Sequence, residues 1–260
     1  MISVDTIEKY YPPQIRDNPV LRKYMIKEYL LLLILDFLSE TRYIRKLVFI
    51  GGTNLRFVKG IDRFSEDLDF DCSGFSKDEF DDMTGKVLQF LKRSGFHALM
   101  KMGDESKLSA WRCSFFFPGF LFEIGMTGHR EERFLIKIEA EDQQLEYKSV
   151  MANIRKCGFF FPVPVPPDSV LCSMKISAML SRMKGRDFYD VIFLLGFTGP
   201  DYKILSHRFG INDSKDLKQQ ITGMLGSVDL SKKRRDFEHL LFNPGNSSRI
   251  LRFADFIDEL

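Results

Sequence analysis

The feature that most constrains this chain is a run of six residues, DLDFDC, in which aspartate alternates with apolar residues. Side chains two residues apart point to the same face of a β-strand. The alternation therefore predicts a strand with Asp67, Asp69 and Asp71 on one face and Leu68 and Phe70 on the other. The apolar face needs a core to pack against, and the three like charges repel one another unless something positive or solvent stabilises them.

Composition sets the size of the core and limits what the chain binds. The 260 residues are 44% hydrophobic, which is enough for a core in one large domain or in two modest ones. Charged residues make up 28%, which argues against a disordered chain. Because the net charge is only +2, binding of nucleic acid has to come from a local basic patch.

The sequence contains no motif for a zinc-bound cysteine cluster, a signal peptide or a membrane span. The four cysteines form no CxxC pair, and no histidine lies at a zinc-ligand spacing from them. The N-terminus has no apolar signal core, and the longest strongly apolar run, Leu30–Leu35, is far shorter than the ~20 residues of a spanning helix. We therefore expect a reduced, soluble, cytoplasmic protein with no membrane partner.

The first 150 residues mix helix and strand patterns. Residues 19–40 and 76–95 are typical of helices, the second with Ser76 as its N-cap and Gly95 as its C-cap. Short apolar or alternating runs predict strands, the first of which leads directly into a glycine turn. The predicted strands are 47–52, 67–72, 96–102, 111–117 and 133–141.

A proline-rich segment divides the chain. Residues 159–168, FFFPVPVPPD, hold four prolines within seven residues, a density that excludes a helix or a central strand. We expect a linker here, between an α+β domain at 1–165 and a helical C-terminal domain at 166–260. The first helix of the second domain is predicted over 168–195, with a break or bend at Gly185.

The alternating carboxylates suit a hard divalent cation. The side chains of Asp67 and Asp69 leave the strand about 6–7 Å apart, so both can reach one ion. Mg²⁺ keeps several waters and commonly uses one or two carboxylates plus substrate phosphates. A third carboxylate from a neighbouring strand completes a two-metal site for nucleotidyl transfer. Glu139 in LIKIEAE is the first candidate for it, and Glu123 in FLFEIGM is the second.

The residues alone leave two other interpretations of the acidic run open. Asp67, Asp69, Asp71 and Asp78 stand at positions 1, 3, 5 and 12 of a calcium loop, but Cys72 stands where that loop has glycine. The run also suits a solvated edge strand, because charges protect the edges of sheets from further pairing. By itself, Asp71 is interpreted as an edge charge or a turn residue rather than as a ligand.

A glycine turn precedes the acidic run. Gly51, Gly52 and Thr53 follow a predicted strand and present bare backbone N–H groups, which hold phosphate oxygens where such a turn leads into a helix. The threonine hydroxyl adds a donor. An ordinary tight turn is the alternative for two adjacent glycines.

The order of these features resembles the nucleotidyltransferase superfamily that includes polymerase beta. That superfamily has an apolar residue, then Gly-Gly or Gly-Ser, then Asp-x-Asp on the next strand. The stretch GGTNLRFVKGIDRFSEDLDF is more specifically similar to the AbiEii-type nucleotidyltransferase toxins of abortive-infection, toxin–antitoxin systems. The matching residues are Gly51, Gly52, Thr53, Leu55, Arg56, Gly60, Arg63, Phe64, Ser65, Asp67, Leu68, Asp69 and Phe70.

A second match to that family follows the proline-rich segment, and Ile138-Glu139 lies between the two. The family has a helix with a lysine, an alanine and an arginine, followed by Arg/Lys-Asp-x-x-Asp. The resemblance covers roughly residues 30–200 and implies a mixed β-sheet with flanking helices. The matching residues are Lys175, Ala178, Arg182, Arg186, Asp187 and Asp190.

Helical spacing places Lys175, Met179, Arg182 and Arg186 on one stripe, which would face the carboxylates and bind triphosphate. A solvated basic face is the alternative. Asp187 and Asp190 lie close enough in the helix to pair with Arg186 or Lys184. The resemblance implies that Lys175 contacts nucleotide and that Asp187 belongs to the active site.

The resemblance implies an Mg²⁺- or Mn²⁺-dependent enzyme that transfers a nucleoside monophosphate from an NTP to an acceptor hydroxyl. The acceptor would be RNA, notably the tRNA 3′ end, and the protein would be a toxin with a cognate antitoxin. Asp67, Asp69 and Glu139 would hold metal, with Glu139 also assisting deprotonation of the acceptor. Lys175 would orient the triphosphate, and Arg182 is a further phosphate-binding candidate.

Two other functions fit the same residues less fully. An antibiotic-modifying nucleotidyltransferase would share the turn and the carboxylates, but the second motif argues against it. A non-catalytic nucleotide-binding or interaction protein would have kept only the fold. The basic run SKKRRDF at 231–237 is a candidate RNA contact, although a solvated helix face is the more common role of such a run.

Overall fold

The structure is a computed structural model that describes residues 4–103 and 110–259. The chain divides into two compact units. The first consists of the residues up to Gly60 together with Phe64–Val165, and the second consists of Ile61–Arg63 together with the residues from Pro166 onward. The short segment Ile61–Arg63 therefore belongs to the second unit although both of its flanks belong to the first.

The first unit is built on a mixed five-stranded sheet with the order β1-β2-β5-β4-β3. Every neighbouring pair is antiparallel except β2 and β5, which run parallel. All five strands fall within the strand predictions. Their bounds are β1 Leu47–Ile50, β2 Asp67–Cys72, β3 Leu99–Met102, β4 Trp111–Phe116 and β5 Leu135–Glu141.

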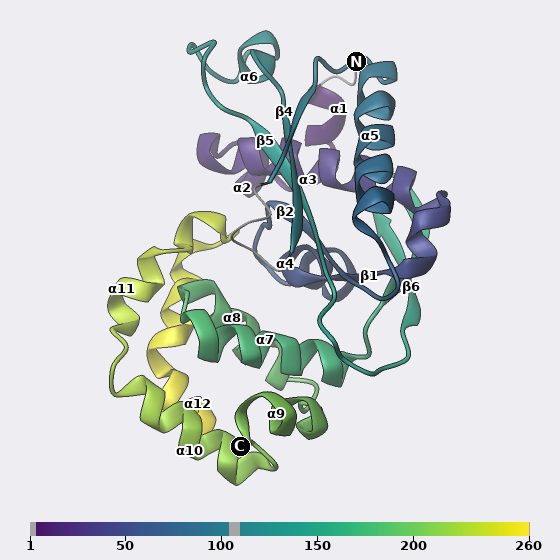
Figure 1. Cartoon of the computed structure of the whole chain (residues 1–260). Helices are drawn as coiled ribbons and strands as arrows, with labels where there is room; N and C mark the ends of the chain where they lie inside the picture. Colours follow the sequence, from purple (N-terminus) through teal and green to yellow (C-terminus); the bar gives the residue numbers. More distant parts are fainter. Residues whose placement is uncertain (1–3, 104–109, 260) are drawn as a thin grey trace. The chain divides into compact units, whose positions relative to one another are not determined.

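Two long helices pack against each other and against this sheet (Figure 1). Helix α3 spans Pro19–Ser39 and begins at Asn18, whose side chain accepts hydrogen bonds from the first turn. Helix α5 spans Lys77–Arg93, and Ser76 forms a capping box with Glu79. Both helices confirm the predictions. Shorter helical segments of this unit are α1 Val4–Glu8, α2 Pro13–Arg16, η1 Arg42–Lys46, α4 Gly51–Asn54, η2 Leu55–Lys59 and α6 Phe120–Glu123.

The proline-rich segment is a strand, so the prediction of a linker over 159–168 was wrong for most of its length. Strand β7 (Phe159–Val165) pairs with β6 (Val150–Lys156) in a separate two-stranded antiparallel sheet. Pro162 and Pro164 occupy alternate positions, and backbone N–H groups alternate in direction along a strand. Prolines are tolerated here because their missing N–H groups fall on the edge that faces away from β6.

The second unit is helical apart from an isolated bridge between Arg63 and Leu241. The predicted break near Gly185 is confirmed, because α7 ends before Met183, which has a left-handed backbone with φ of 49°. No described helix is long and apolar enough to cross a membrane. The helices are α7 Asp168–Arg182, α8 Gly185–Leu195, α9 Tyr202–Phe209, α10 Ser214–Leu225, α11 Leu230–Arg235, η4 Glu238–Leu240, η5 Pro244–Arg252 and α12 Phe253–Asp258.

Candidate functional site

Strand β2, which carries the acidic run, lies in the interior of the sheet. It pairs with β1 on one side and with β5 on the other. An edge strand would have one free side, so the interpretation as a solvated acidic edge is wrong. The calcium-loop alternative is also excluded, since Asp67–Cys72 form a continuous strand.

The parallel register between β2 and β5 brings the predicted carboxylates together. Asp69 lies opposite Glu139, and Asp67 lies opposite Lys137. Partner residues in a ladder point to the same side of the sheet, so these side chains share one face. The side chain of Asp67 is 27% exposed and that of Glu139 is 22% exposed, whereas Leu68 on the opposite face is completely buried. The alternation predicted for β2 is thus confirmed here.

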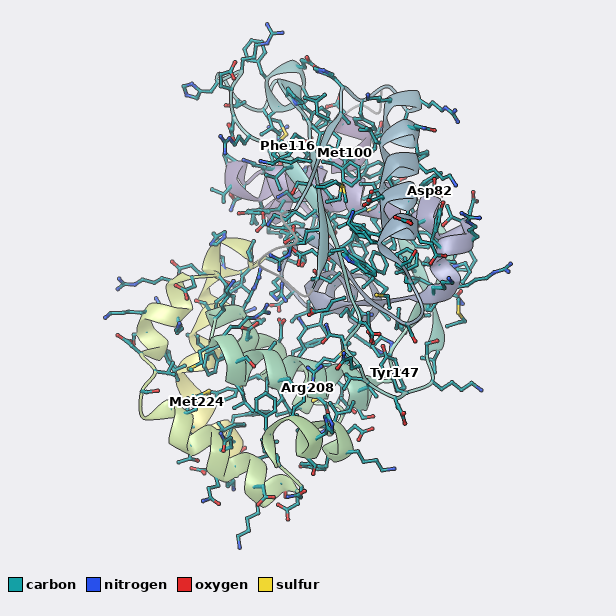
Figure 2. The ribbon with its side chains drawn as sticks, in the orientation of Figure 1. Asp82, Met100, Phe116, Tyr147, Arg208 and Met224 are labelled. Atoms are coloured by element: carbon teal, nitrogen blue, oxygen red, sulfur yellow. The ribbon has the colours of Figure 1, made fainter. Side chains whose placement is uncertain are left out.

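Asp71 departs from the expectation of an edge charge or turn residue. It lies in an interior strand and is only 6% exposed. The backbone N–H of Gln143 donates to its Oδ1 at 2.9 Å, and the hydroxyl of Tyr147, labelled in Figure 2, donates to its Oδ2. Burial raises the pKa of the Asp71 carboxyl, against the opposing effect of these hydrogen bonds. Asp71 therefore anchors the segment that follows β5.

The glycine turn packs directly against one of the carboxylates. β1 ends at Ile50, which lies opposite Asp69, and Gly51 follows with φ of 81°. A Cβ added at position 51 would lie 2.8 Å from Cγ of Asp69 and closer still to Oδ2. Only glycine allows both the left-handed backbone and this close approach. The turn and the carboxylate strand are therefore in contact, as a phosphate-and-metal site requires.

Thr53 fastens the turn to the start of β2. Its side chain is fully buried, and its hydroxyl donates a hydrogen bond to the backbone oxygen of Asp67. The next residue, Asn54, donates from Nδ2 to the backbone oxygen of Phe49 at 2.6 Å. The hydroxyl predicted to bind phosphate thus makes a bond inside the protein, where it holds the glycine turn in place.

Cations compensate part of the negative charge on this face. Lys137 Nζ lies 4.0 Å from Asp67 Oδ2, and Arg112 Nε lies 3.0 Å from Glu139 Oε2. Within 4–103 and 110–259, no three His, Cys, Asp or Glu side chains are grouped to hold a metal ion. The part-exposed oxygens of Asp67 and Asp69 nevertheless fit Mg²⁺, which accepts two protein carboxylates when phosphates and water supply its other ligands.

The second candidate, Glu123, lies outside this arrangement. It belongs to the short helix α6, which follows β4, and not to a strand. It lines a cavity of about 280 Å³ at the end of β4 and β5, together with Phe116 and Arg130. Glu123 therefore does not supply a third carboxylate from a neighbouring strand, and a short apolar run such as the one around it suits a helix as well as a strand.

In the second unit, Asp190 is buried between two cations. Arg63 donates from Nε and Nη2 to its two oxygens at 2.7 Å each, and Lys175 Nζ donates to Oδ2 at 2.9 Å. Burial by itself would raise the pKa of Asp190, but the charges of Arg63 and Lys175 outweigh it and lower that pKa. Asp190 therefore accepts hydrogen bonds from two cationic side chains at once.

A second ion pair joins the same two helices. Arg182, the last residue of α7, donates to both oxygens of Asp187 at 2.9 and 2.6 Å, and the backbone N–H of Lys184 also donates to Asp187. Arg186 belongs to α8, so the continuous cationic stripe from Lys175 to Arg186 was a wrong prediction. The aspartates accept from the side chains of Arg63, Lys175 and Arg182 and not, as expected, from the side chain of Arg186 or Lys184.

Two further sets of contacts involve Arg56, a motif residue, and Asp62, which is next to the motif residue Arg63. Arg56 pairs with the buried Glu28 of α3, with Nε 2.7 Å from Oε2. In the second unit, Asp62 accepts from Tyr189 and from Asn246, each at 2.7 Å. The paired residues lie 28, 127 and 184 positions apart in the sequence, and no local pattern connects residues at such separations. The arginine of the GGT-x-LR motif therefore has a structural partner inside the first unit.

A glycine turn in contact with paired aspartates on the next strand of a mixed sheet defines a nucleotidyltransferase fold. The model of the family described as nucleotidyl transferase AbiEii toxin, type IV toxin–antitoxin system, matches residues 33–240. The chain belongs to this family and is a nucleotidyltransferase toxin, and membership implies an antitoxin partner.

Solved structures share the fold. MenT4, a nucleotidyltransferase toxin from Mycobacterium tuberculosis, is 16% identical with a TM-score of 0.59, over 100% of this chain and 91% of its own. JHP933 from Helicobacter pylori is 19% identical with a TM-score of 0.53, over 91% of this chain and 90% of its own. No curated protein sequence matches the chain.

Replacing Gly51 with Ala is expected to lower nucleotidyl transfer by about a hundredfold, because the added methyl displaces the Asp69 carboxylate. Gly60→Ala is the matched control, since Gly60 is also left-handed, with φ of 77°, but a Cβ there meets nothing within 4 Å. Transfer of labelled nucleotide and the thermal midpoint are measured for both variants. Equal losses of activity in both would show that backbone strain alone is responsible.

Asp190→Asn is expected to lower the free energy of unfolding by about 3–5 kcal/mol at pH 7, because Arg63 and Lys175 are left as buried, uncompensated cations. In the unaltered protein the pKa of the Asp190 carboxyl is lowered by folding. The stabilisation is therefore fully present above the unfolded pKa of about 3.9 and is lost as the pH falls through the folded pKa. Urea denaturation between pH 3 and pH 7 measures both effects.

The control for this measurement is Asp255→Asn, which removes an exposed pair with Arg252 and should cost less than about 1 kcal/mol. A loss at Asp190 as small as the loss at Asp255, or one that does not change with pH, would contradict the buried network.

Proposed function

We propose that this enzyme transfers a nucleoside monophosphate from an NTP to the 3′-terminal hydroxyl of tRNA, with release of pyrophosphate and with dependence on Mg²⁺ or Mn²⁺. The observation that carries the proposal is the parallel pairing of β2 with β5, which aligns Asp69 with Glu139 on one part-exposed face. Family membership supports the toxin role, in which such a transfer would block the use of tRNA in translation.

Asp67 and Asp69 would hold the divalent cation. The cation supplies charge stabilisation for the transferred phosphate and lowers the pKa of a bound hydroxyl. Glu139 would accept the proton of the acceptor hydroxyl or add a ligand to a second ion. Arg112 Nε lies 3.0 Å from Glu139 Oε2, and this ion pair would hold the Glu139 carboxylate in place beside Asp69.

The phosphates would be bound by groups from both motifs. Gly51 and Gly52 would offer backbone N–H groups beside the Asp69 carboxylate, and Thr53 would support them by holding the turn against the backbone of Asp67. Lys175 would neutralise triphosphate charge, and Asp190 would hold its ammonium group in place at 2.9 Å. Only three residues separate Arg63, which belongs to that cluster, from Asp67 in the sequence.

Arg182 would contact phosphate as a fork-shaped donor, with Asp187 holding its guanidinium in place through two hydrogen bonds. The side chain of Arg182 is 43% exposed, so part of it remains available to a ligand, whereas Asp187 is fully buried. Asp187 would thus act by positioning the arginine.

Asp69→Asn is expected to abolish transfer of label from an α-labelled NTP to total tRNA, by at least about a hundredfold, because one cation-binding oxygen is lost. EDTA should have the same effect on the unaltered enzyme. Asp78→Asn is the control, since Asp78 is an exposed carboxylate on α5 away from β2. Label transfer that survives in the Asp69 variant would contradict the site, and transfer that survives EDTA would contradict the metal.

A further inference from the structure

The sheet of the first unit has one face in the core and one face that is partly open. On the core side, Phe115, Ile136, Ile138 and Leu68 from three adjacent strands are all completely buried. On the other side, the paired residues from Leu99, Phe116 and Leu135 as far as Arg112, Glu139 and Asp69 are partly or fully exposed, and Asp71 at the far end of β2 is buried. The open side is the face that bears the catalytic carboxylates, so it is accessible beside the reacting centre.

Strand register sorts this open face into three rows, because directly paired residues point to the same side. The first row is apolar and consists of Leu99, Phe116 and Leu135. The second row is cationic and leads to a carboxylate, in the order Lys101, Ser114, Lys137 and Asp67. The third row consists of Arg112, Glu139 and Asp69.

The cationic row crosses four strands, or about 14 Å at ~4.8 Å per strand. Lys101 at its outer end is exposed, and the side chain of Lys137 is 42% exposed. Arg112 in the neighbouring row is 38% exposed, and its buried Nε makes no hydrogen bond to any described residue, although it lies near Glu139. On the described strands beyond β2, three cations thus share this face with two acids, Glu139 and Glu141, and both acids lie on β5 toward the aspartates while Lys101 lies at the outer edge.

The apolar row runs alongside these cations. Leu99 is 49% exposed, and Phe116, labelled in Figure 2, is part-exposed on the adjacent strand β4. An aromatic or apolar surface next to a basic one is what a single strand of nucleic acid needs, since its bases are free to stack and its phosphates need countercharges. A duplex would keep its bases stacked inside and would leave the apolar row without a partner.

We propose that the open face of β3, β4 and β5 is the binding track for the single-stranded 3′ end of the RNA acceptor. Phosphates would lie along Lys101, Lys137 and Arg112, and bases would pack on the apolar row of Leu99 and Phe116. The terminal hydroxyl would then reach the carboxylate end of the cationic row. This inference rests on the proposed function, because it locates the acceptor of that reaction.

The test is RNA binding by the whole chain without catalysis, measured as fluorescence anisotropy of 5′-labelled tRNA over a range of salt concentrations. Lys101→Glu is expected to weaken binding on the order of tenfold and to reduce the slope of log Kd against log salt by about one. NTP affinity, measured by calorimetry, should not change. Lys92→Glu is the matched control, as an exposed lysine on α5, and should bind RNA like the unaltered protein.

A second variant, Leu99→Gln, keeps every charge and should weaken RNA binding without changing the salt slope. Unaltered RNA affinity in both the Lys101 and Leu99 variants would overturn the track and leave the proposed reaction intact. An equal loss in the Lys92 control, or a parallel loss of NTP affinity, would also overturn it. If the unaltered protein binds no tRNA at all, the RNA acceptor itself is wrong and the track is wrong with it.

Discussion

The carboxylate of Asp69 fills the space that a side chain at position 51 would occupy. This contact fixes the glycine turn against β2, because any larger residue at position 51 would force the strand or the turn away. Thr53 reinforces it from the other side through its bond to the backbone of Asp67. The N–H groups proposed to bind phosphate and the oxygens proposed to bind metal are thereby held as neighbours, which is the kind of preorganisation that nucleotidyl transfer depends on.

The motif at residues 51–70 contains buried arginines that form ion pairs and part-exposed aspartates. Arg56 is paired with the buried Glu28 in the first unit, and Arg63 is paired with the buried Asp190 in the second, so each stabilises its own unit. Asp67 and Asp69 stay part-exposed on the sheet face. The segment Ile61–Arg63 belongs to the second unit, so a continuous motif in the sequence serves both units of the fold.

The sequence predicted what depends on local periodicity and capping. Alternation defined β2, and the Ser76 capping box defined the start of α5, because each signal lies within a few residues. Pairing over long distances was not predictable in the same way. The parallel alignment of β2 with β5 joins residues about 70 positions apart, and no local pattern specifies that Glu139 lies opposite Asp69. Strand β7 was missed because proline density normally excludes strands, and only its place in a two-stranded sheet makes alternate prolines acceptable.

We propose that Asp67 and Asp69 together bind the divalent cation beside the glycine turn. The most direct test of this proposal is titration of Mn²⁺ followed by electron paramagnetic resonance, in the presence of a non-hydrolysable NTP analogue, for the unaltered protein and for Asp67→Asn. We expect saturable Mn²⁺ binding by the unaltered protein and an affinity lower by on the order of tenfold or more in the variant, because one of two carboxylate ligands is lost. Equal Mn²⁺ affinity in the two proteins would contradict the proposal.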